Sequence, residues 1–165
     1  MKLKIKDQIP DTDIFQLIEG EPQKSKLREI IGGGKIVLFG LPGAFTSTCS
    51  KLHLPGFVAN ADKIKAKGIE NIFCLSVNDP YVMNGWGEIN NIGNSVKMLS
   101  DPYLLFTKAI GAEVDRNAKG MGIRSNRYLM VIENFTIINT VSYTHLRAHE
   151  TREDLVWRLV LEKKK

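Results

Sequence analysis

The chain has 165 residues and a mass of 18.5 kDa, with 43% hydrophobic and 25% charged residues, a mixture typical of one globular domain. No apolar stretch approaches a membrane span, and no apolar segment of a signal peptide follows the basic N-terminus, so we expect a cytoplasmic protein with no membrane partner. The net charge of +5 forms no basic stripe with interleaved aromatic residues, which argues against a nucleic-acid partner.

The first half of the chain alternates between short apolar runs and helical patterns. Its predicted elements are a strand with Lys2, Lys4 and Lys6 on the outer face, buried strands over 35–41 and 71–77, and helices over 50–67 and 80–91. Pro55 and Gly56 should kink or interrupt the first helix early, because proline lacks an amide donor and clashes with the preceding turn.

The second half predicts more strands than helices. Its elements are a strand over 96–99, a short helix around 103–110, a glycine-rich connection over 119–123, and strands over 127–132 and 135–139. Glu133 and Asn134 are expected to form the turn of a terminal hairpin. Strands that alternate with helices and then end in a hairpin indicate a mixed α/β architecture.

Cys49 lies where the first buried strand passes through a short loop into a helix. Thr46, Ser47 and Thr48 supply hydroxyl groups that can cap this helix. A thiol in the first turn lies at the positive end of the helix dipole and beside unpaired amides, and both stabilise a thiolate. The alternative is that Cys49 is a small buried hydrophobic residue, but the surrounding hydroxyls and turn formers favour a nucleophile. Cys74, inside the apolar run FCLSV, is predicted to be inert core.

Other patterns leave alternatives open. His53, four residues after Cys49, is either a base that activates the thiol or a histidine packed in the core, and we favour packing. Arg127 opens a predicted strand, where it is either functional or a surface charge. The run GGGK lacks the spacing of a phosphate loop, and no cysteine and histidine set has zinc spacing, so we expect no cofactor and no metal.

The segment PGAFTSTC, residues 42–49, matches the P-x-x-x-T/S-x-x-C signature of peroxiredoxins. The longer runs KIVLFGLPGAFTSTCSKLHLPGFV and LSVNDPYVMNGWG, and the later RSNRY, are similar to the atypical type II branch of that family, the peroxiredoxin-5 group. The resemblance covers roughly residues 1–139. It implies an α/β, thioredoxin-like fold with a central mixed sheet flanked by helices, and the activity of a thiol peroxidase.

The resemblance also implies roles for single residues. Cys49 would attack hydroperoxides as a thiolate and become a sulfenic acid. Thr46 would offer its hydroxyl to the peroxide, and Arg127 its guanidinium, which also holds the thiolate. Pro42 would pack over the sulfur and limit access of solvent. Arg124 is the second choice for the role of Arg127.

A family member of this type needs a reductant. Because Cys74 is expected to be buried in its strand and the end of the chain has no cysteine, we expect a one-cysteine cycle with an external thiol, from glutathione, glutaredoxin or thioredoxin. The resemblance further implies a homodimer. The alternative functions are a redox-sensing thiol protein and a non-catalytic module on the same fold, although no C-x-x-C motif supports disulfide exchange.

Residues 142–165 depart from the family pattern. This segment is similar to a peptide that recurs at the ends of unrelated open reading frames from environmental sequence assemblies, as translated adaptor sequence would. We therefore assign residues 1–141 to the peroxiredoxin domain and residues 142–165 to a tail outside it. Thr151 could begin a helix in this tail, with Asp154 at its third position and an apolar side.

Overall fold

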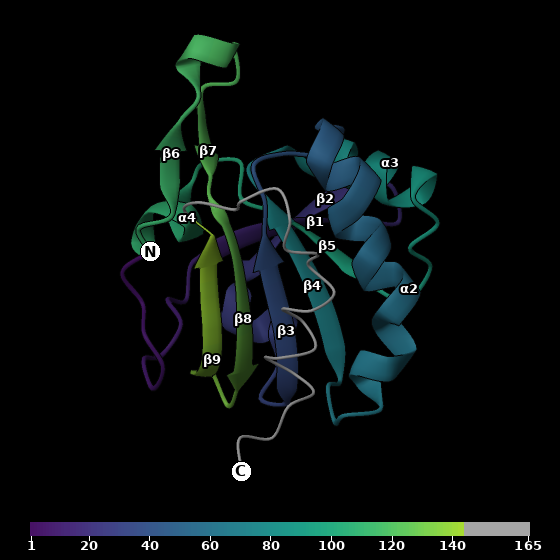
Figure 1. Ribbon diagram of the computed structural model, residues 1–165, viewed down its shortest axis with the longest axis vertical. Helices are drawn as coiled ribbons and strands as arrows, with labels where there is room; N and C mark the ends of the chain where they lie inside the picture. Colours follow the sequence, from purple (N-terminus) through teal and green to yellow (C-terminus); the bar gives the residue numbers. More distant parts are fainter. Residues whose placement is uncertain (144–165) are drawn as a thin grey trace.

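Seven strands form one mixed sheet within residues 1–143, the part of the chain that the computed structural model describes (Figure 1). The strands, in chain order, are β1 (Asp13–Ile18), β2 (Glu21–Lys26), β3 (Lys35–Gly40), β4 (Asn71–Ser76), β5 (Lys97–Ser100), β8 (Arg127–Glu133) and β9 (Thr136–Tyr143). Their order across the sheet is β2-β1-β5-β4-β3-β8-β9. The N-terminal hairpin of β1 and β2 was not predicted, because β2 is largely exposed and polar.

Strands β3, β4 and β5 are parallel neighbours at the centre, while β8 and β9 add antiparallel strands on one side and β1 and β2 on the other. Parallel strands require crossover connections, and two helices provide them here. They are α2 (Leu54–Lys65) between β3 and β4, and α3 (Pro80–Ile89) between β4 and β5. The predicted central mixed sheet flanked by helices is therefore confirmed.

Both faces of the central strands are buried. On β3, Val37 and Phe39 join the hydrophobic cluster under α2 and α3, whereas Ile36 and Leu38 join a second cluster on the other face. The second cluster is covered by α1 (Leu27–Ile31), α4 (Leu105–Ala109) and the N-terminal segment. A strand buried on both faces has an unbroken apolar sequence, which is why 35–41 was recognised as a strand.

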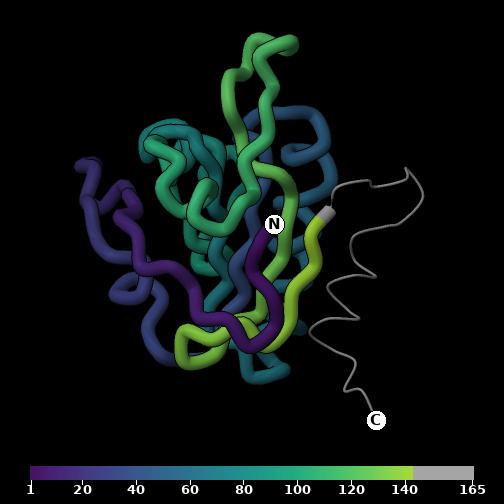
Figure 2. Tube along the Cα trace, turned by 90° about the vertical axis from the view of Figure 1, so that its left-hand side faces the viewer, coloured from purple at the N-terminus to yellow at the C-terminus, as the bar shows by residue number. Residues whose placement is uncertain are grey.

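A small hairpin projects from the body of the molecule (Figures 1 and 2). It consists of β6 (Glu113–Asp115), the short helix η2 (Asn117–Lys119) and β7 (Ile123–Ser125). Sequence analysis predicted only a glycine-rich connection here, since each of these strands has just three residues. The hairpin matters for the site because the chain passes from β7 almost directly into β8.

The predicted strand around Lys2, Lys4 and Lys6 is wrong. All three lysines are exposed, but the backbone turns instead of extending: Lys6 has φ +81°, and the Asp7 carboxylate accepts a hydrogen bond from the Lys4 amide at 2.8 Å. This short Asx-type interaction competes with strand formation, which an alternating pattern alone does not reveal.

The terminal hairpin exists, but its turn lies one residue later than predicted. Asn134 and Phe135 occupy the turn, with φ +47° and +63°. Two consecutive positive φ angles are the mark of the turn that matches the twist of two antiparallel strands. Asparagine tolerates this conformation well, whereas phenylalanine gives no such signal in the sequence. Strand β9 continues to Tyr143, two residues past the predicted domain boundary at 141/142. The helix predicted from Thr151 lies outside the described residues.

Candidate active site

Cys49 lies in the first turn of the helix that follows β3 and the loop Pro42–Thr46, which we call the 42–46 loop. Its thiol is completely buried. The helix begins with a π-helical stretch, η1 (Cys49–His53), in which the Leu54 amide donates to the Cys49 carbonyl, and continues as α2. The expected interruption near Pro55 is therefore a π-helical stretch just before it, rather than a break. The predicted position of the thiol at a helix N-terminus is confirmed.

Arg127 approaches the thiol from the neighbouring strand. Its Nη1 lies 3.1 Å from the Cys49 Sγ. The pairing of β8 with β3 explains this contact: Gly40 is opposite Tyr128, so Arg127 lies just beyond the end of β3, where the chain turns toward Cys49 (Figure 1). A guanidinium at hydrogen-bond distance from sulfur stabilises the negatively charged thiolate.

His53 packs in the core next to this pair. It is 3% exposed, and its ring lies 5.7 Å from that of Phe39 and 5.9 Å from that of Phe57, measured between ring centres. Its Nδ1 is also 3.4 Å from Arg127 Nη1. The packing interpretation of His53 is thus correct, and the histidine in addition contacts the arginine that holds the thiol.

The 42–46 loop folds over the start of the helix. The Thr46 hydroxyl donates to the Gly43 carbonyl at 2.8 Å, and Pro42 is buried, with its carbonyl 3.4 Å from Nη1 of Arg124. The expectation that Thr46, Ser47 or Thr48 caps the helix is not met: Thr46 bonds back into its own loop, and the Thr48 side chain makes no capping bond. The loop uses the hydroxyl for its own turn because a carbonyl three residues back is within reach.

Arg124 and Arg127 have different partners. Arg124 donates through Nε to the Met121 carbonyl at 2.7 Å and through Nη1 to Pro42, so it joins the projecting hairpin to the 42–46 loop. Arg127 alone of the two has a hydrogen bond to sulfur within the described part of the chain. The choice of Arg127 over Arg124 agrees with this geometry.

Asn78 was not predicted as a site residue from the sequence. Its Oδ1 accepts hydrogen bonds from the Ala44 amide at 2.9 Å and from the Ser76 hydroxyl at 2.8 Å, so it contacts the 42–46 loop directly. One signal could have revealed it, since Asn78 follows a buried parallel strand, and polar residues at the carboxyl ends of such strands commonly serve the site.

Cys74 is fully buried on β4, opposite Phe39 of β3. Burial raises the pKa of the Cys74 thiol well above its usual range, and the charge of the Cys49 thiolate raises it further. The predicted burial of Cys74 in its strand is confirmed, and a raised pKa disfavours the thiolate, which is the reactive form of cysteine.

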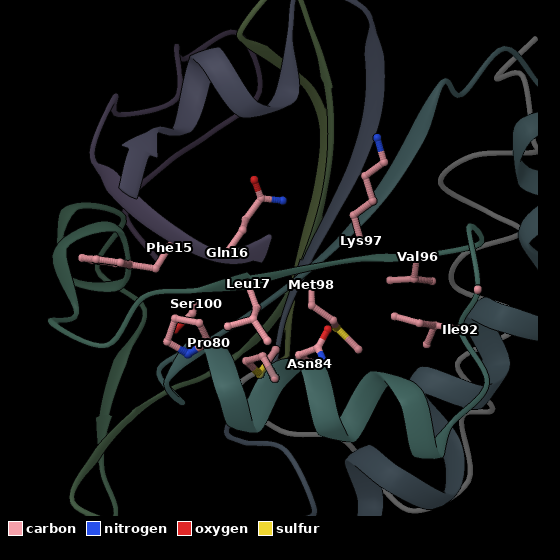
Figure 3. A pocket seen from close by; sticks show the side chains of 12 residues that line it. Phe15, Gln16, Leu17, Pro80, Asn84, Ile92, Val96, Lys97, Met98 and Ser100 are labelled. Carbon is pink, nitrogen blue, oxygen red and sulfur yellow. The ribbon is translucent and has the colours of Figure 1, made fainter. Parts of the chain in front are cut away.

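A hollow of about 200 Å³ lies elsewhere, between β1, β5 and α3 (Figure 3). Phe15, Leu17, Asn84, Lys97 and Met98 are among the residues that line it, and none of the predicted site residues does.

Within residues 1–143, no three His, Cys, Asp or Glu side chains converge as a metal ion would require. No helix in that range is long and apolar enough to cross a membrane.

The chain is similar in sequence and fold to known proteins. The family model described as Redoxin matches residues 4–155. The curated relative peroxiredoxin-2D of Arabidopsis thaliana is 40% identical over 136 residues, which cover 82% of this chain and 84% of that protein.

Solved structures agree with this match. Reduced Prx3 of Vibrio vulnificus in complex with hydrogen peroxide is 37% identical, has a TM-score of 0.84, and is matched over 93% of this chain and 97% of that chain. Peroxiredoxin 5 of Alvinella pompejana is 30% identical, with a TM-score of 0.78 and coverage of 86% and 90%. A buried cysteine at a helix N-terminus, an arginine on its sulfur and these likenesses lead to one conclusion: the chain belongs to the peroxiredoxin family of thiol peroxidases.

Proposed function

We propose that Cys49 is the peroxidatic residue and that it reduces hydrogen peroxide and organic hydroperoxides. The observation that carries this proposal is the 3.1 Å contact between Arg127 Nη1 and Cys49 Sγ, at a sulfur buried in the first turn of a helix. The Vibrio vulnificus relative, whose structure holds hydrogen peroxide, supports this substrate class.

The first step transfers one oxygen atom. The Cys49 thiolate attacks the terminal peroxide oxygen, the O–O bond breaks, and the bonding electron pair leaves with the second oxygen as hydroxide or alkoxide, which takes up a proton. Sulfur is oxidised to sulfenic acid and the peroxide is reduced to water or an alcohol. Because negative charge moves from sulfur to the departing oxygen, a guanidinium that reaches both atoms stabilises the transition state, and Arg127 has this role.

Thr46 and Pro42 complete the proposed site. The Thr46 hydroxyl uses its proton in the bond to Gly43, which leaves its oxygen lone pairs to accept a hydrogen bond from the peroxide O–H. Pro42 is buried at the start of the loop and limits the access of water to the sulfur. Thr46 thus orients the peroxide and Pro42 shields the sulfur, and neither activates the thiol.

The second step needs an external thiol. Cys74 is buried, and its raised pKa keeps it protonated, so we infer a one-cysteine cycle. A thiolate of glutathione, glutaredoxin or thioredoxin attacks the sulfenic sulfur and expels hydroxide, which takes up a proton to become water. A second thiol then cleaves the mixed disulfide, leaves as the other half of a new disulfide, and restores the Cys49 thiol. We further propose that the protein is a cytoplasmic homodimer.

Stopped-flow oxidation of the reduced protein by hydrogen peroxide tests this function. We expect fast oxidation that Cys49→Ser abolishes and Cys74→Ser largely retains, because only Cys49 is placed for reaction. Turnover of hydrogen peroxide with an added thiol should likewise be abolished in Cys49→Ser and largely kept in Cys74→Ser, and equal losses of turnover in the two variants would indicate a two-cysteine cycle. Oxidation of the unaltered protein no faster than that of a free thiol would show that the site is not assembled, and would favour a non-catalytic module. Fast oxidation without turnover on any added thiol would favour a redox sensor.

A further inference from the structure

The carboxyl ends of three parallel strands meet at Asn78, just after β4. Ser76, the last residue of β4, donates its hydroxyl to the Asn78 Oδ1 at 2.8 Å. Ser100, the last residue of β5, is fully buried and donates its hydroxyl to the Asn78 carbonyl. The amide of Ala44, in the loop after β3, also donates to Oδ1, at 2.9 Å. Asn78 is therefore held by the ends of β4 and β5, and it in turn holds the 42–46 loop that follows β3.

The hydrogen bond between the Ala44 amide and Asn78 lies directly before Phe45, whose backbone conformation is unfavourable. Phe45, the next residue, has φ +61°, a left-handed conformation that is unfavourable for a residue with a β-carbon. The following residue, Thr46, accepts the first helical hydrogen bond from Ser50, at 3.0 Å. Thr46 and Cys49 are three residues apart and so lie on the same side of the helix start. A fixed Ala44 thus fixes where Thr46 lies relative to the sulfur.

The loop is also closely packed at this point. A β-carbon added to Gly43 would lie 2.9 Å from Arg124 Nη1 and 3.4 Å from Asn78 Oδ1, so both side chains are in contact with the loop backbone. Ala44 itself is buried, with 8% exposure. The loop therefore has little room to move while both contacts are kept.

We propose that Asn78 is a positioning residue for peroxide reduction. Its side-chain oxygen holds the 42–46 loop through the Ala44 amide, so that Thr46 meets the peroxide in the geometry for in-line attack by Cys49. This role rests on the proposed function of Cys49 and Thr46. Asn78 is not expected to activate the thiolate, because within the described residues the hydrogen bond to the sulfur comes from Arg127. Its loss is therefore expected to slow the reaction with peroxide and to spare reactions that need only a thiolate.

The test compares two reactions of Cys49 in Asn78→Ala. The rate constant for oxidation by hydrogen peroxide should fall about tenfold or more, because small displacements of an orienting group have large effects on rate. The rate of alkylation of Cys49 by iodoacetamide should stay unchanged, since alkylation does not use Thr46. Asn78→Asp keeps the oxygen acceptor and should recover most of the oxidation rate. Asn84→Ala is the matched control, because Asn84 lines the hollow between β1, β5 and α3, and within the described residues its side chain bonds to Glu88.

Three results would overturn the proposal. One is an Asn78→Ala variant that is oxidised as fast as the unaltered protein. Another is a parallel loss of oxidation and alkylation, which would mean that Asn78 supports the thiol itself. The third is an Asn78→Asp variant no faster than Asn78→Ala. If the unaltered protein shows no fast oxidation that depends on Cys49, the proposed function fails first, so the two failures are distinguishable.

Amide hydrogen exchange in the unaltered protein provides a measurement that does not depend on folding of a variant. The Ala44 amide should exchange far more slowly than an exposed loop amide, because it is buried and bonded to Asn78. Exchange of Ala44 at the rate of an unprotected amide would show that the bond is not kept in solution and would refute the positioning role.

Discussion

At the residue scale, Arg124 and Arg127 are both candidates for the arginine that holds the thiol, and their hydrogen-bond partners distinguish them. Arg124 donates to two backbone carbonyls, whereas Arg127 donates to the sulfur of Cys49. Both residues stand near the start of β8 and have the same chemistry, so the difference comes from their surroundings. The strand pairing that sets Tyr128 opposite Gly40 directs Arg127 toward the sulfur.

Matched substitutions to lysine test this assignment. We expect Arg127→Lys to slow oxidation of Cys49 by hydrogen peroxide about 100-fold or more, because lysine cannot hold the sulfur and the peroxide with one planar group. Arg124→Lys should change the rate no more than about threefold, since its 3.4 Å contact with Pro42 is a weak hydrogen bond. Stopped-flow oxidation measures both rates, and the reverse order would assign the role to Arg124.

The buried Cys74 thiol and Tyr128 hydroxyl should make the free energy of unfolding fall at high pH. Burial raises the pKa of the Cys74 thiol and of the Tyr128 hydroxyl well above their ordinary values of 9.0 and 10.0. The folded protein therefore keeps these protons at a pH where the unfolded chain loses them. The resulting stabilisation is complete below pH 9 and declines as the pH rises, by about 1.4 kcal/mol per pH unit for each group.

Urea unfolding at pH 8.0, 9.5 and 10.5 checks this dependence. We expect the free energy of unfolding to fall over this range, and to fall less steeply in Cys74→Ala, which lacks one of the two groups. The comparison of slopes removes the effect of the small cavity that this substitution creates. The same slope in both proteins would mean that Cys74 titrates alike in the folded and unfolded states.

At the scale of elements, the contact between β3 and β8 is what brings Arg127 to Cys49. Gly40 ends β3 and lies against the ring of Tyr128 on β8: an added β-carbon would be 2.2 Å from the ring atom Cε1. Tyr128 is fully buried, so its ring has no space into which to move. Glycine is required here because the backbone and an aromatic ring come too close for any side chain.

Gly40→Ala is accordingly expected to destabilise the protein by about 1–3 kcal/mol, the cost of overpacking a core. It should also slow oxidation of Cys49, because relief of the clash shifts the strand that carries Arg127. Gly56→Ala in α2 is the control: nothing lies within 4 Å of its added β-carbon, and alanine favours a helix, so stability should stay or rise. Thermal unfolding and stopped-flow oxidation measure both effects. Equal stability of the two variants would contradict the close approach.

At the scale of the whole molecule, the extent of the domain decides whether the tail takes part in the reaction. The contacts described above for Cys49, Thr46 and Asn78 join residues within 1–143, the described part of the chain. The assignment of residues 142–165 to a tail outside the domain therefore predicts that the tail is dispensable for the reaction.

A chain that ends after Tyr143, the last residue of β9, tests whether the rest of the tail is dispensable. We expect it to react with hydrogen peroxide at the rate of the full chain and to keep its thermal unfolding temperature. Sedimentation should give both proteins about twice the mass of one chain, as the proposed homodimer requires. A shortened protein that is monomeric or slow to react would show that the tail belongs to the domain.

The fold class and the position of Cys49 at a helix N-terminus were predictable from the sequence alone. Cys49 was recognisable because the physical signals are local: a buried strand, a loop of turn formers and a helix start all lie within fifteen residues of it. The continuous apolar runs of β3 and β4 likewise reveal strands buried on both faces. These properties do not depend on what the rest of the chain does.

The family resemblance named Arg127, but only the tertiary structure showed how Arg127 reaches the sulfur and that Asn78 reaches the 42–46 loop. The sequence separates Asn78 from Ala44 by 34 residues and Arg127 from Cys49 by 78 residues, and no local pattern encodes such pairs. Strand order and register set both contacts, since they bring the ends of β3, β4, β5 and the start of β8 together. Strand pairing is cooperative over the entire sheet, so it depends on the sequence of the whole chain and cannot be predicted from one segment.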